Sequence, residues 1–241
     1  IDLQSRFNVN SIMASDPVIA KKQRERLRRL MDLVGIPKDT ESTVTTQMLS
    51  ELILDWIDND QEPTGFDGQE DLDYLGLERP YRAANSVIWD ISELMLIEGF
   101  TPNDIAALAD WVCFLPPDVA LNVNTADPKV LDAYELGLPG AQLEEERVKD
   151  GPARHASGFL DMQAFDDLIA TAATKVPVTG TGNDDQEQNG QNGGLNDPKP
   201  TNNKAVGNFS VNSEYYLLEA EAVINQKPVL MRSILYRPAL K

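Results

Sequence analysis

The sequence predicts an α+β protein in which a small antiparallel sheet domain is interrupted by a large all-helical insertion. Three observations predict this class. Polar and apolar residues alternate near the start, helical periodicity runs through the middle, and two β-rich segments joined by a short turn close the chain. The predicted organisation is a discontinuous sheet domain over 1–13 and 205–241, an inserted helical domain over 14–178, and a flexible polar linker over 179–204.

The composition describes an acidic globular chain with one or two domains. It has 241 residues, of which 41% are hydrophobic, and a net charge of −18. This excess of negative charge disfavours nucleic acid as a partner, because phosphate backbones are held by Lys and Arg. The sequence contains no run of about 20 apolar residues that could span a membrane. One Cys and one His exclude an intrachain disulfide and a Cys-rich zinc site.

The first segments predict a strand followed by a long helix. Leu3, Phe7 and Val9 alternate in part with polar residues, which is typical of a half-buried strand. Asp16 and Pro17 then supply an N-cap and a first-turn proline, and the helical pattern continues to a stop near residue 35. The helix carries a basic patch that we interpret as a solvated face: Lys21, Lys22, Arg24, Arg26, Arg28 and Arg29.

Further helices follow with short connections. The apolar residues between Thr45 and Ile57 repeat at helical spacing, and we expect this stripe to lie in the core. Four later segments begin with a capping residue: a short helix from Asp90 that Gly99 ends, a helix from Thr101-Pro102, one from Asp127 to Leu136 and one from Asp161 to Ala173. Residues 16–175 are therefore predicted to form an all-helical body.

The last third of the chain predicts a linker and a hairpin. Thr179 to Lys204 has hardly an apolar side chain, so burial there cannot offset the entropy of ordering. Two β-rich segments, 208–224 and 229–237, are joined by a predicted four-residue turn, Asn225 to Pro228. A sheet of the opening strand and this hairpin is thin and needs something to cover it.

A dense acidic segment predicts a calcium site. Between Asp39 and Glu78 there are twelve carboxylates and no Lys or Arg. Such crowding is costly unless a cation neutralises it, and oxygen ligands without His or Cys select Ca²⁺ over zinc. The alternative is an acidic loop that is merely solvated. The cluster lies directly after Trp56 and Ile57, so we expect it to lie against the core.

The spacing in this segment departs from an EF-hand. Asp58, Asp60 and Glu62 occupy the first three ligand positions, but Pro63 replaces the turn glycine and Gln69 stands at position 12. We therefore predict a calcium loop of another kind. Its candidate ligands are Asp58, Asp60, Glu62, Glu70, Asp71, Asp73 and Asn85.

Residues 121–148 resemble a helix-hairpin-helix unit with a Leu-Pro-Gly turn. Members that bind DNA present glycine amides to a phosphate. Here the second helix carries Glu144, Glu145 and Glu146, which would repel phosphate, so we expect the fold without DNA binding.

No nucleophile motif surrounds Cys113 or His155, and no carboxylate pair stands out as a hydrolytic site. The sequence favours a protein that is not an enzyme.

Several segments together resemble a known family. They are residues 2–10, 54–60, 68–74, 80–85, 92–94 and 121–126 and the run that begins at Tyr215, and they are collinear over nearly the whole chain. The family is minor pseudopilin K of bacterial type II secretion systems, also called general secretion pathway protein K or GspK. Two departures are Ser5 in place of the usual glycine and Gln69 in place of the usual alanine.

The resemblance implies a pilin-like α/β domain with a helical domain, of helix-hairpin-helix or SAM-like type, inserted after the first strand. Such a domain is normally built on a long N-terminal hydrophobic helix. This chain would then be the soluble, periplasmic part, with the inner-membrane anchor absent from it. The resemblance also implies that the inserted domain binds calcium, as one or two ions, on the segment from Asp58 to Asp73 with Asn85 nearby.

The leading functional hypothesis is a structural protein that caps and nucleates the pseudopilus tip with minor pseudopilins I and J. We expect partner contacts mainly from the absent helix, and around Phe7, Tyr215 and Tyr216 if these aromatics are not core residues. The alternative is a calcium-dependent binding module that recognises secreted cargo or an outer-membrane partner through the helical domain.

Overall fold

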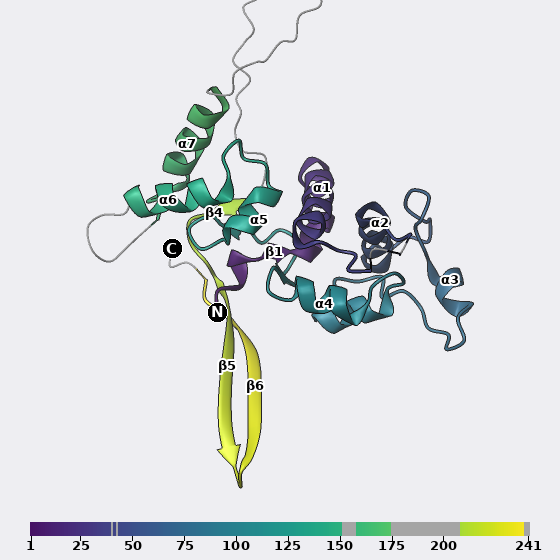
Figure 1. Ribbon diagram of the computed structural model, residues 1–241. Helices are drawn as coiled ribbons and strands as arrows, with labels where there is room; N and C mark the ends of the chain where they lie inside the picture. Colours follow the sequence, from purple (N-terminus) through teal and green to yellow (C-terminus); the bar gives the residue numbers. More distant parts are fainter. Residues whose placement is uncertain (40, 42, 151–157, 175–207, 239–241) are drawn as a thin grey trace, which may run out of the picture.

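The computed structural model describes residues 1–39, 41, 43–150, 158–174 and 208–238. A helical body holds most of them, and one long antiparallel hairpin extends away from it (Figure 1). This mixture of helices and a small antiparallel sheet confirms the predicted α+β class. The predicted linker, 179–204, and His155 lie outside the described residues.

The first two α-helices form where their caps predict them. Helix α1 spans Pro17–Val34, and the Asp16 carboxylate accepts hydrogen bonds from two first-turn amides. Gly35 ends this helix in the left-handed conformation, with φ 69°. Helix α2 spans Thr46–Ile57, and the Thr45 hydroxyl accepts from the Met48 amide. Local capping chemistry therefore determines both boundaries.

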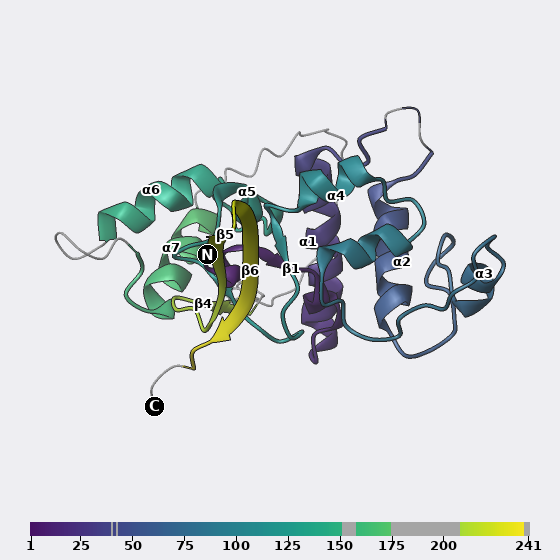
Figure 2. The same ribbon diagram turned by 90° about the horizontal axis from the view of Figure 1, so that it is seen from below.

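The helices that follow α2 are α3 (Asp71–Leu75), the 3-10 helix η3 (Ile91–Leu96), α4 (Pro102–Leu108), α5 (Pro128–Ala133), α6 (Gly140–Asp150) and α7 (Met162–Thr174). In Figure 2, α5, α6 and α7 lie together on one side of α1, and α3 lies beyond α2 on the other side. The helix predicted from Asp90 forms as η3 and ends at Leu96, before Gly99. Helix α3 was not predicted, because five residues are too few to show helical periodicity.

One hydrophobic cluster runs through the helical body. Helix α1 packs against both α2 and α5, and its Leu27, Leu30 and Met31 are fully buried. The apolar stripe of α2 is buried in the same cluster, as its spacing predicts. No helix within the described ranges is long and apolar enough to cross a bilayer.

The opening segment differs from the predicted half-buried strand. It forms two 3-10 helices, η1 (Leu3–Ser5) and η2 (Val9–Met13), on either side of the two-residue strand β1 (Phe7–Asn8). Strand β1 pairs in parallel with β2 (Val112–Cys113) of the helical body, not with the C-terminal hairpin. The contact with the C-terminal hairpin is made by residues before β1, where Asp2 forms an antiparallel bridge with Tyr216.

Buried amide side chains explain this difference. The Asn8 side chain donates to Pro116 O and accepts from Leu115 N, and Asn10 makes equivalent bonds to the backbone of Ile88 and Leu115. Both asparagines are buried because they satisfy backbone groups of another segment. The apparent alternation of apolar and polar residues therefore does not separate an inner face from an outer one.

The hairpin forms as predicted, with a tighter turn. Strands β5 (Tyr215–Ile224) and β6 (Lys227–Tyr236) are joined by Asn225 and Gln226 alone, with φ of 50° and 65°. A two-residue turn with both residues left-handed matches the right-handed strand twist, and asparagine tolerates it. Pro228 lies inside β6, where both strands are edges and a missing N–H is tolerated.

Residues before the hairpin return to the body. Strand β4 (Phe209–Ser210) pairs in parallel with β3 (Leu121–Asn122), so the β-rich segment predicted from Asn208 is divided by a bend. Phe7 and Phe209 both pack with the main hydrophobic cluster. The proposed boundaries between sheet domain and helical domain stay a prediction.

Candidate metal centre

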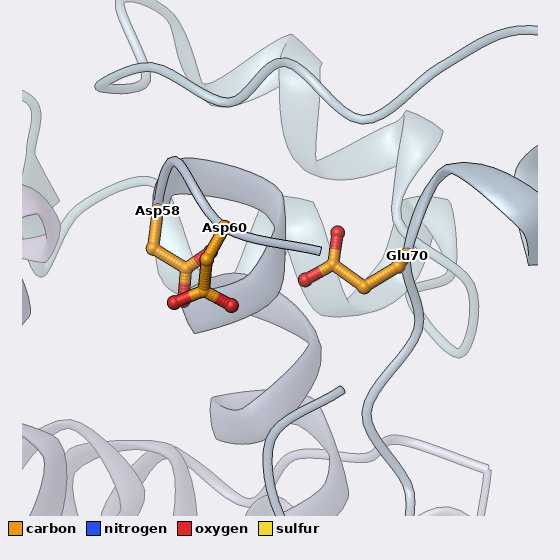
Figure 3. A group of neighbouring side chains, drawn as sticks. All are labelled: Asp58, Asp60 and Glu70. Carbon is orange, nitrogen blue, oxygen red and sulfur yellow. The ribbon is translucent and has the colours of Figure 1, made fainter. Parts of the chain in front are cut away.

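Three carboxylates converge at the C-terminal end of α2. Asp58 follows the last residue of the helix, Asp60 lies two residues further on, and Glu70 directly precedes α3. The side chains point toward one another, and one oxygen from each lies within 4.8 Å of the others (Figure 3). Oxygens that bind one Ca²⁺ at about 2.3–2.6 Å are at most about 5 Å apart, so the spacing fits a shared cation.

Polar atoms at this point are buried without protein partners. Glu70 is 3% exposed, and neither of its carboxylate oxygens accepts a hydrogen bond from the described residues. The same holds for Asp58 Oδ1. Burying a charge without a partner is costly, and a bound cation is one of the few compensations that suit several carboxylates together.

The electrostatics agree with the geometry. Burial, followed by the nearby carboxylates of Asp60 and Asp55, raises the pKa of Asp58 to about 6. Burial, followed by the charges of Asp55 and Asp58, raises the pKa of Glu70 to about 7. Each carboxylate therefore makes its neighbour harder to ionise, and a divalent cation would reverse that effect.

Asp55 is a buried member of this region that the predicted ligand set omitted. It lies on α2 with no exposed surface, and its two oxygens accept from the Thr64 amide at 3.0 and 3.1 Å. Burial raises its pKa. A side chain at Gly68 would lie 2.3 Å from the Asp55 carboxylate, so the glycine lets the loop close over it. The sequence did contain a signal for Asp55, because it is an acidic residue next to the apolar stripe of a helix predicted to lie in the core.

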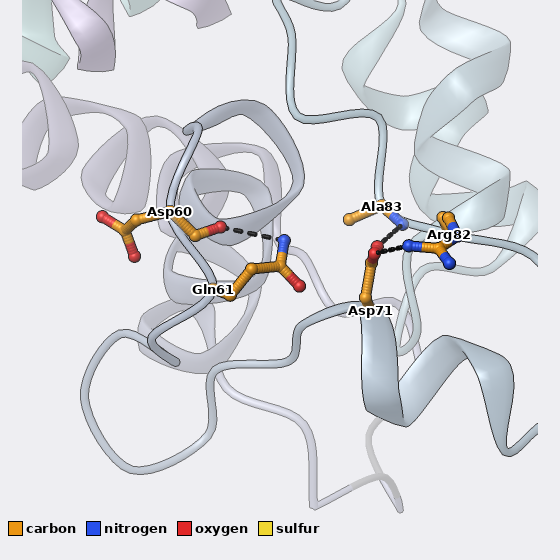
Figure 4. A network of polar contacts seen from close by, with 5 residues as sticks. All are labelled: Asp60, Gln61, Asp71, Arg82 and Ala83. Atoms are coloured by element: carbon orange, nitrogen blue, oxygen red, sulfur yellow. Dashed lines mark hydrogen bonds and ion pairs between the residues drawn. The ribbon is translucent and has the colours of Figure 1, made fainter.

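Asp71 is held by other groups. Its Oδ2 accepts from the Arg82 guanidinium at 2.7 Å, and its Oδ1 accepts from the Ala83 amide at 3.1 Å (Figure 4). The structure therefore places Asp71 in a clamp between α3 and the segment at residue 82, outside the group of three carboxylates.

Asp73 and Glu62 also lie outside that group. Asp73 Oδ2 accepts from the Glu70 amide at 2.9 Å, so it orients the residue that carries the buried carboxylate. Glu62 is exposed, and its amide donates to Asp60 Oδ1 at 3.0 Å. Both residues shape the loop around the three converging carboxylates.

Asn85 offers a neutral oxygen near the same helix end. Its amide donates to Trp56 O at 2.9 Å, two residues before Asp58, and its backbone is left-handed with φ 45°. The side-chain Oδ1 is buried and accepts no hydrogen bond from the described residues. An all-oxygen group of carboxylates and a neutral amide fits a hard cation such as Ca²⁺.

An aromatic wall lies behind these groups. The rings of Trp56, Tyr74 and Tyr81 contact one another at centroid distances of 5.3–6.3 Å. The Tyr74 hydroxyl is buried, and its pKa is raised, first by burial. This wall lowers the local dielectric and strengthens both the repulsion between carboxylates and their attraction to a cation.

The other chemically active groups are engaged in structural contacts. The Cys113 thiol is buried, donates to Arg6 O at 3.7 Å and has a raised pKa because of burial, so it stays protonated. The Gly140 amide, in the helix-hairpin-helix turn, donates to Asp132 Oδ1 at 2.6 Å. It is therefore not directed at a phosphate.

Comparisons with known proteins give the family. Residues 5–117 match the model of type II secretion system (T2SS), protein K. Protein K of Pseudomonas aeruginosa is 36% identical over 176 residues, which are 73% of this chain and 49% of that protein. Protein K of Aeromonas hydrophila is 30% identical over 192 residues, covering 73% and 54%.

A solved structure extends the likeness over the fold. The crystal structure of the GspK-GspI-GspJ complex from the enterotoxigenic Escherichia coli type 2 secretion system contains a chain similar to this one. The TM-score is 0.67 at 25% identity, and the match covers 99% of this chain and 73% of that chain.

The chain belongs to the type II secretion system protein K family. This confirms the resemblance found in the sequence. The chain spans about half the length of the curated protein K relatives described above. The part that matches the protein K model includes the whole candidate centre, from Asp55 to Asn85.

Proposed function

We propose that this protein is a structural minor pseudopilin that caps the tip of the type II secretion pseudopilus in the periplasm, together with minor pseudopilins I and J. The observation that carries this proposal is the structural match, over 99% of the chain, to a protein solved as a GspK-GspI-GspJ complex. The protein would act by its shape and its contacts, and it would catalyse no reaction.

The hairpin supports an assembly function. Alternate residues place Leu218, Met231 and Leu235 on the same face of β5 and β6, and all three are 41–53% exposed. Two small residues lie on the same face: Ala220, which pairs with Met231, and Ala222, which is nearer the turn. An exposed apolar face with small residues suits close packing against an apolar helix, which is how we propose the subunit is held in the pseudopilus.

We also propose that the helical body binds Ca²⁺. Asp58, Asp60 and Glu70 would hold the ion, with Asn85 as a neutral ligand. The ion would neutralise the buried carboxylates and tie the end of α2 to the start of α3. In this scheme Asp71, Asp73 and Glu62 position the loop and do not bind the ion directly.

Mixing the chain with purified I and J pseudopilins tests the assembly proposal. We expect a stable complex of all three proteins in size-exclusion chromatography with light scattering, formed without any secreted protein. If the chain elutes alone at concentrations well above micromolar, the proposed tip function is wrong.

Calcium titration by calorimetry tests the metal proposal separately. We expect Glu70→Gln to abolish binding, because Glu70 is the most buried of the three proposed ligand carboxylates, and Glu62→Gln to leave binding nearly unchanged. Equal binding by both variants would contradict the assigned ligands.

One observation favours the binding-module alternative as a second candidate. Phe66 and Leu72 are 97% and 84% exposed, and they lie on either side of Glu70 in the chain. Exposed apolar side chains close to a calcium site could contact a secreted protein or an outer-membrane partner in a calcium-dependent way. Binding of secreted protein that requires calcium and is lost in Phe66→Ser would favour this function, whereas unchanged binding would exclude this surface.

A further inference from the structure

We propose that a basic hollow between α1 and α2 binds a carboxylate-bearing segment of a polypeptide partner. The α1 wall of the hollow carries Lys21, Arg24 and Arg28 together with one acid, Glu25, and the hollow has a volume of about 420 Å³. This volume is within the range of about 300–1,000 Å³ that is typical of ligand pockets. The proposal is independent of calcium and of the tip function.

The three cations share one face of α1. They are separated by three and four residues, which places them above one another along the helix. Helix α2 forms the opposite wall, with Gln47 and Leu54 among its lining residues. Figures 1 and 2 both show α1 and α2 side by side, so the hollow lies between two packed and capped helices. A rigid frame of this kind holds charges in place for a ligand.

These cations lack the partners that the other arginines of α1 have. Arg29 forms an ion pair with Glu135 at 2.7 Å, and the Arg26 guanidinium lies 4.3 Å from the centre of the Tyr134 ring. Among the described residues, Lys21, Arg24 and Arg28 form no ion pair. This is unexpected in a chain with 39 acidic and 21 basic residues, where acidic partners are in excess.

The side chain of Arg28 is a second observation, besides the missing ion pairs, that supports a ligand in the hollow. Its Nε is buried, and no acceptor among the described residues bonds to it. A buried donor without an acceptor loses the hydration it had in the unfolded chain and gains nothing in exchange. A carboxylate is the acceptor that fits the planar guanidinium fork best, because it can take two parallel hydrogen bonds.

The charge around the hollow selects a carboxylate over a phosphate group. Glu51 lies on the α2 wall, where its carboxylate accepts from the Asp67 amide at 3.4 Å and from the Gln47 side chain. Glu25 of α1 is a second acid in the lining, and the two negative charges repel a phosphate dianion more strongly than a singly charged carboxylate. The net charge of −18 opposes nucleic acid in the same way. Leu54 also lines the hollow, and it can contact the aliphatic part of a glutamate side chain.

Fluorescence anisotropy tests the hollow with a defined probe, a labelled peptide of alternating glutamate and glycine. We expect the full chain to bind this peptide at low salt and not to bind one of alternating glutamine and glycine. Binding should weaken as salt is added, because the charges of the hollow are partly screened. No binding of the glutamate peptide by the wild-type chain would overturn the proposal.

Matched variants distinguish the hollow from general charge. We expect the double variant Arg24→Gln, Arg28→Gln to weaken peptide binding at least about tenfold, as expected for lost hydrogen bonds to a charged group. Lys22→Gln removes a positive charge from an exposed residue of the same helix that does not line the hollow, and it should change affinity less than about twofold. Equal losses in the two proteins would overturn the proposed site.

A second pair of variants and two other anions complete the test. If the double variant does not fold, Lys21→Glu replaces an exposed residue that lines the hollow, and it should weaken binding more than Lys22→Glu does. Inorganic phosphate and phosphatidylglycerol vesicles are the other anion sources to compare. Displacement of the peptide by phosphate at lower concentration than by free glutamate, or vesicle binding that Arg28→Gln abolishes, would reject a polypeptide carboxylate as the ligand.

Discussion

The acidic loop at the end of α2 and the C-terminal hairpin depart from ordinary burial in opposite directions. The loop buries charge, since Glu70 is 3% exposed and its oxygens have no partner among the described residues. The hairpin exposes apolar surface, since Ile224, Leu230 and Met231 are all more than half exposed. Each arrangement is costly for the chain alone, and each indicates a different compensation: a cation in the loop and an apolar surface on the hairpin.

The difference predicts that stability and the proposed assembly depend on separate parts of this protein. A ligand of the loop would join segments within the helical body, so it should mainly affect folding stability. A partner on the hairpin would contact residues outside the core, so its loss should mainly affect assembly. Variants in the two regions should therefore separate these effects.

The largest expected effect is on assembly through the hairpin. Leu218→Asp together with Met231→Asp should weaken the complex with I and J at least about 100-fold, because charge replaces apolar contacts on one face. The melting temperature should stay close to that of the wild type, since both residues are exposed. Leu230→Asp, on the other face of β6, is the control. If Leu230→Asp weakens the complex equally, the interface is not limited to the proposed face.

The next effect is on stability through the loop. At a calcium concentration of about 100 times the dissociation constant, binding stabilises the native state by about 2.7 kcal/mol. For a domain of this size that is a rise of about 5–10 °C in melting temperature relative to chelator. Glu70→Gln should lose this rise, and Phe66→Ser should keep it. If calcium still raises the melting temperature of Glu70→Gln, the ion does not bind at this group of carboxylates.

A smaller effect concerns pH. In chelator, the native carboxyls of Asp58 and Glu70 hold protons up to about pH 6 and 7, whereas in the unfolded chain they lose them near pH 4. The native state therefore binds more protons in this window, and the stability from these groups falls as pH rises from about 4 to 7.

Comparison with Glu70→Gln isolates that contribution. In chelator, the melting temperature of the wild type should fall relative to that of this variant as the pH rises from 5 to 8. In calcium the sign should reverse, because the ion binds the ionised carboxylates. Parallel pH profiles for both proteins in chelator would show that Glu70 is not a buried acid with a raised pKa.

The smallest expected effect concerns the hairpin turn. Gln226 has φ 65°, a conformation that glycine adopts without strain. Gln226→Gly should stabilise the hairpin by about 0.5–1 kcal/mol, which slows hydrogen exchange of β5 and β6 amides by about twofold to fivefold. Faster exchange in this variant would show that flexibility of the unfolded turn outweighs relief of strain.

Local signals in the sequence predicted much of the helical body. The caps at Asp16 and Thr45 act on amides within three residues, so α1 and α2 begin where the sequence indicates. The candidate centre was predicted as a region, because charge density is visible in the sequence. Which carboxylates converge was not, since Asp71 is held by Arg82 and Asp73 by the Glu70 amide.

The predictions from the sequence were wrong where contacts with distant segments determine the local structure. The opening segment was predicted as a half-buried strand, yet its Asn8 and Asn10 are buried and bond backbone groups about 80 to 110 residues away. Phe7 was considered for a partner surface and is fully buried in the core, whereas Tyr215 and Tyr216 are partly buried beside the first residues of the chain. Composition cannot show which distant backbone groups need a hydrogen-bond partner.

The sequence by itself determined the α+β class, the positions of the capped helices, the family and the place where negative charge accumulates. These depend on interactions between near neighbours and on residue content, which are visible in one dimension. The tertiary structure alone decided that Asp58, Asp60 and Glu70 face one another, that Asp55 is sealed beneath Gly68, and that cations of α1 line a hollow against α2. Burial and mutual distance are properties of the folded chain, and they set the charge state of each group.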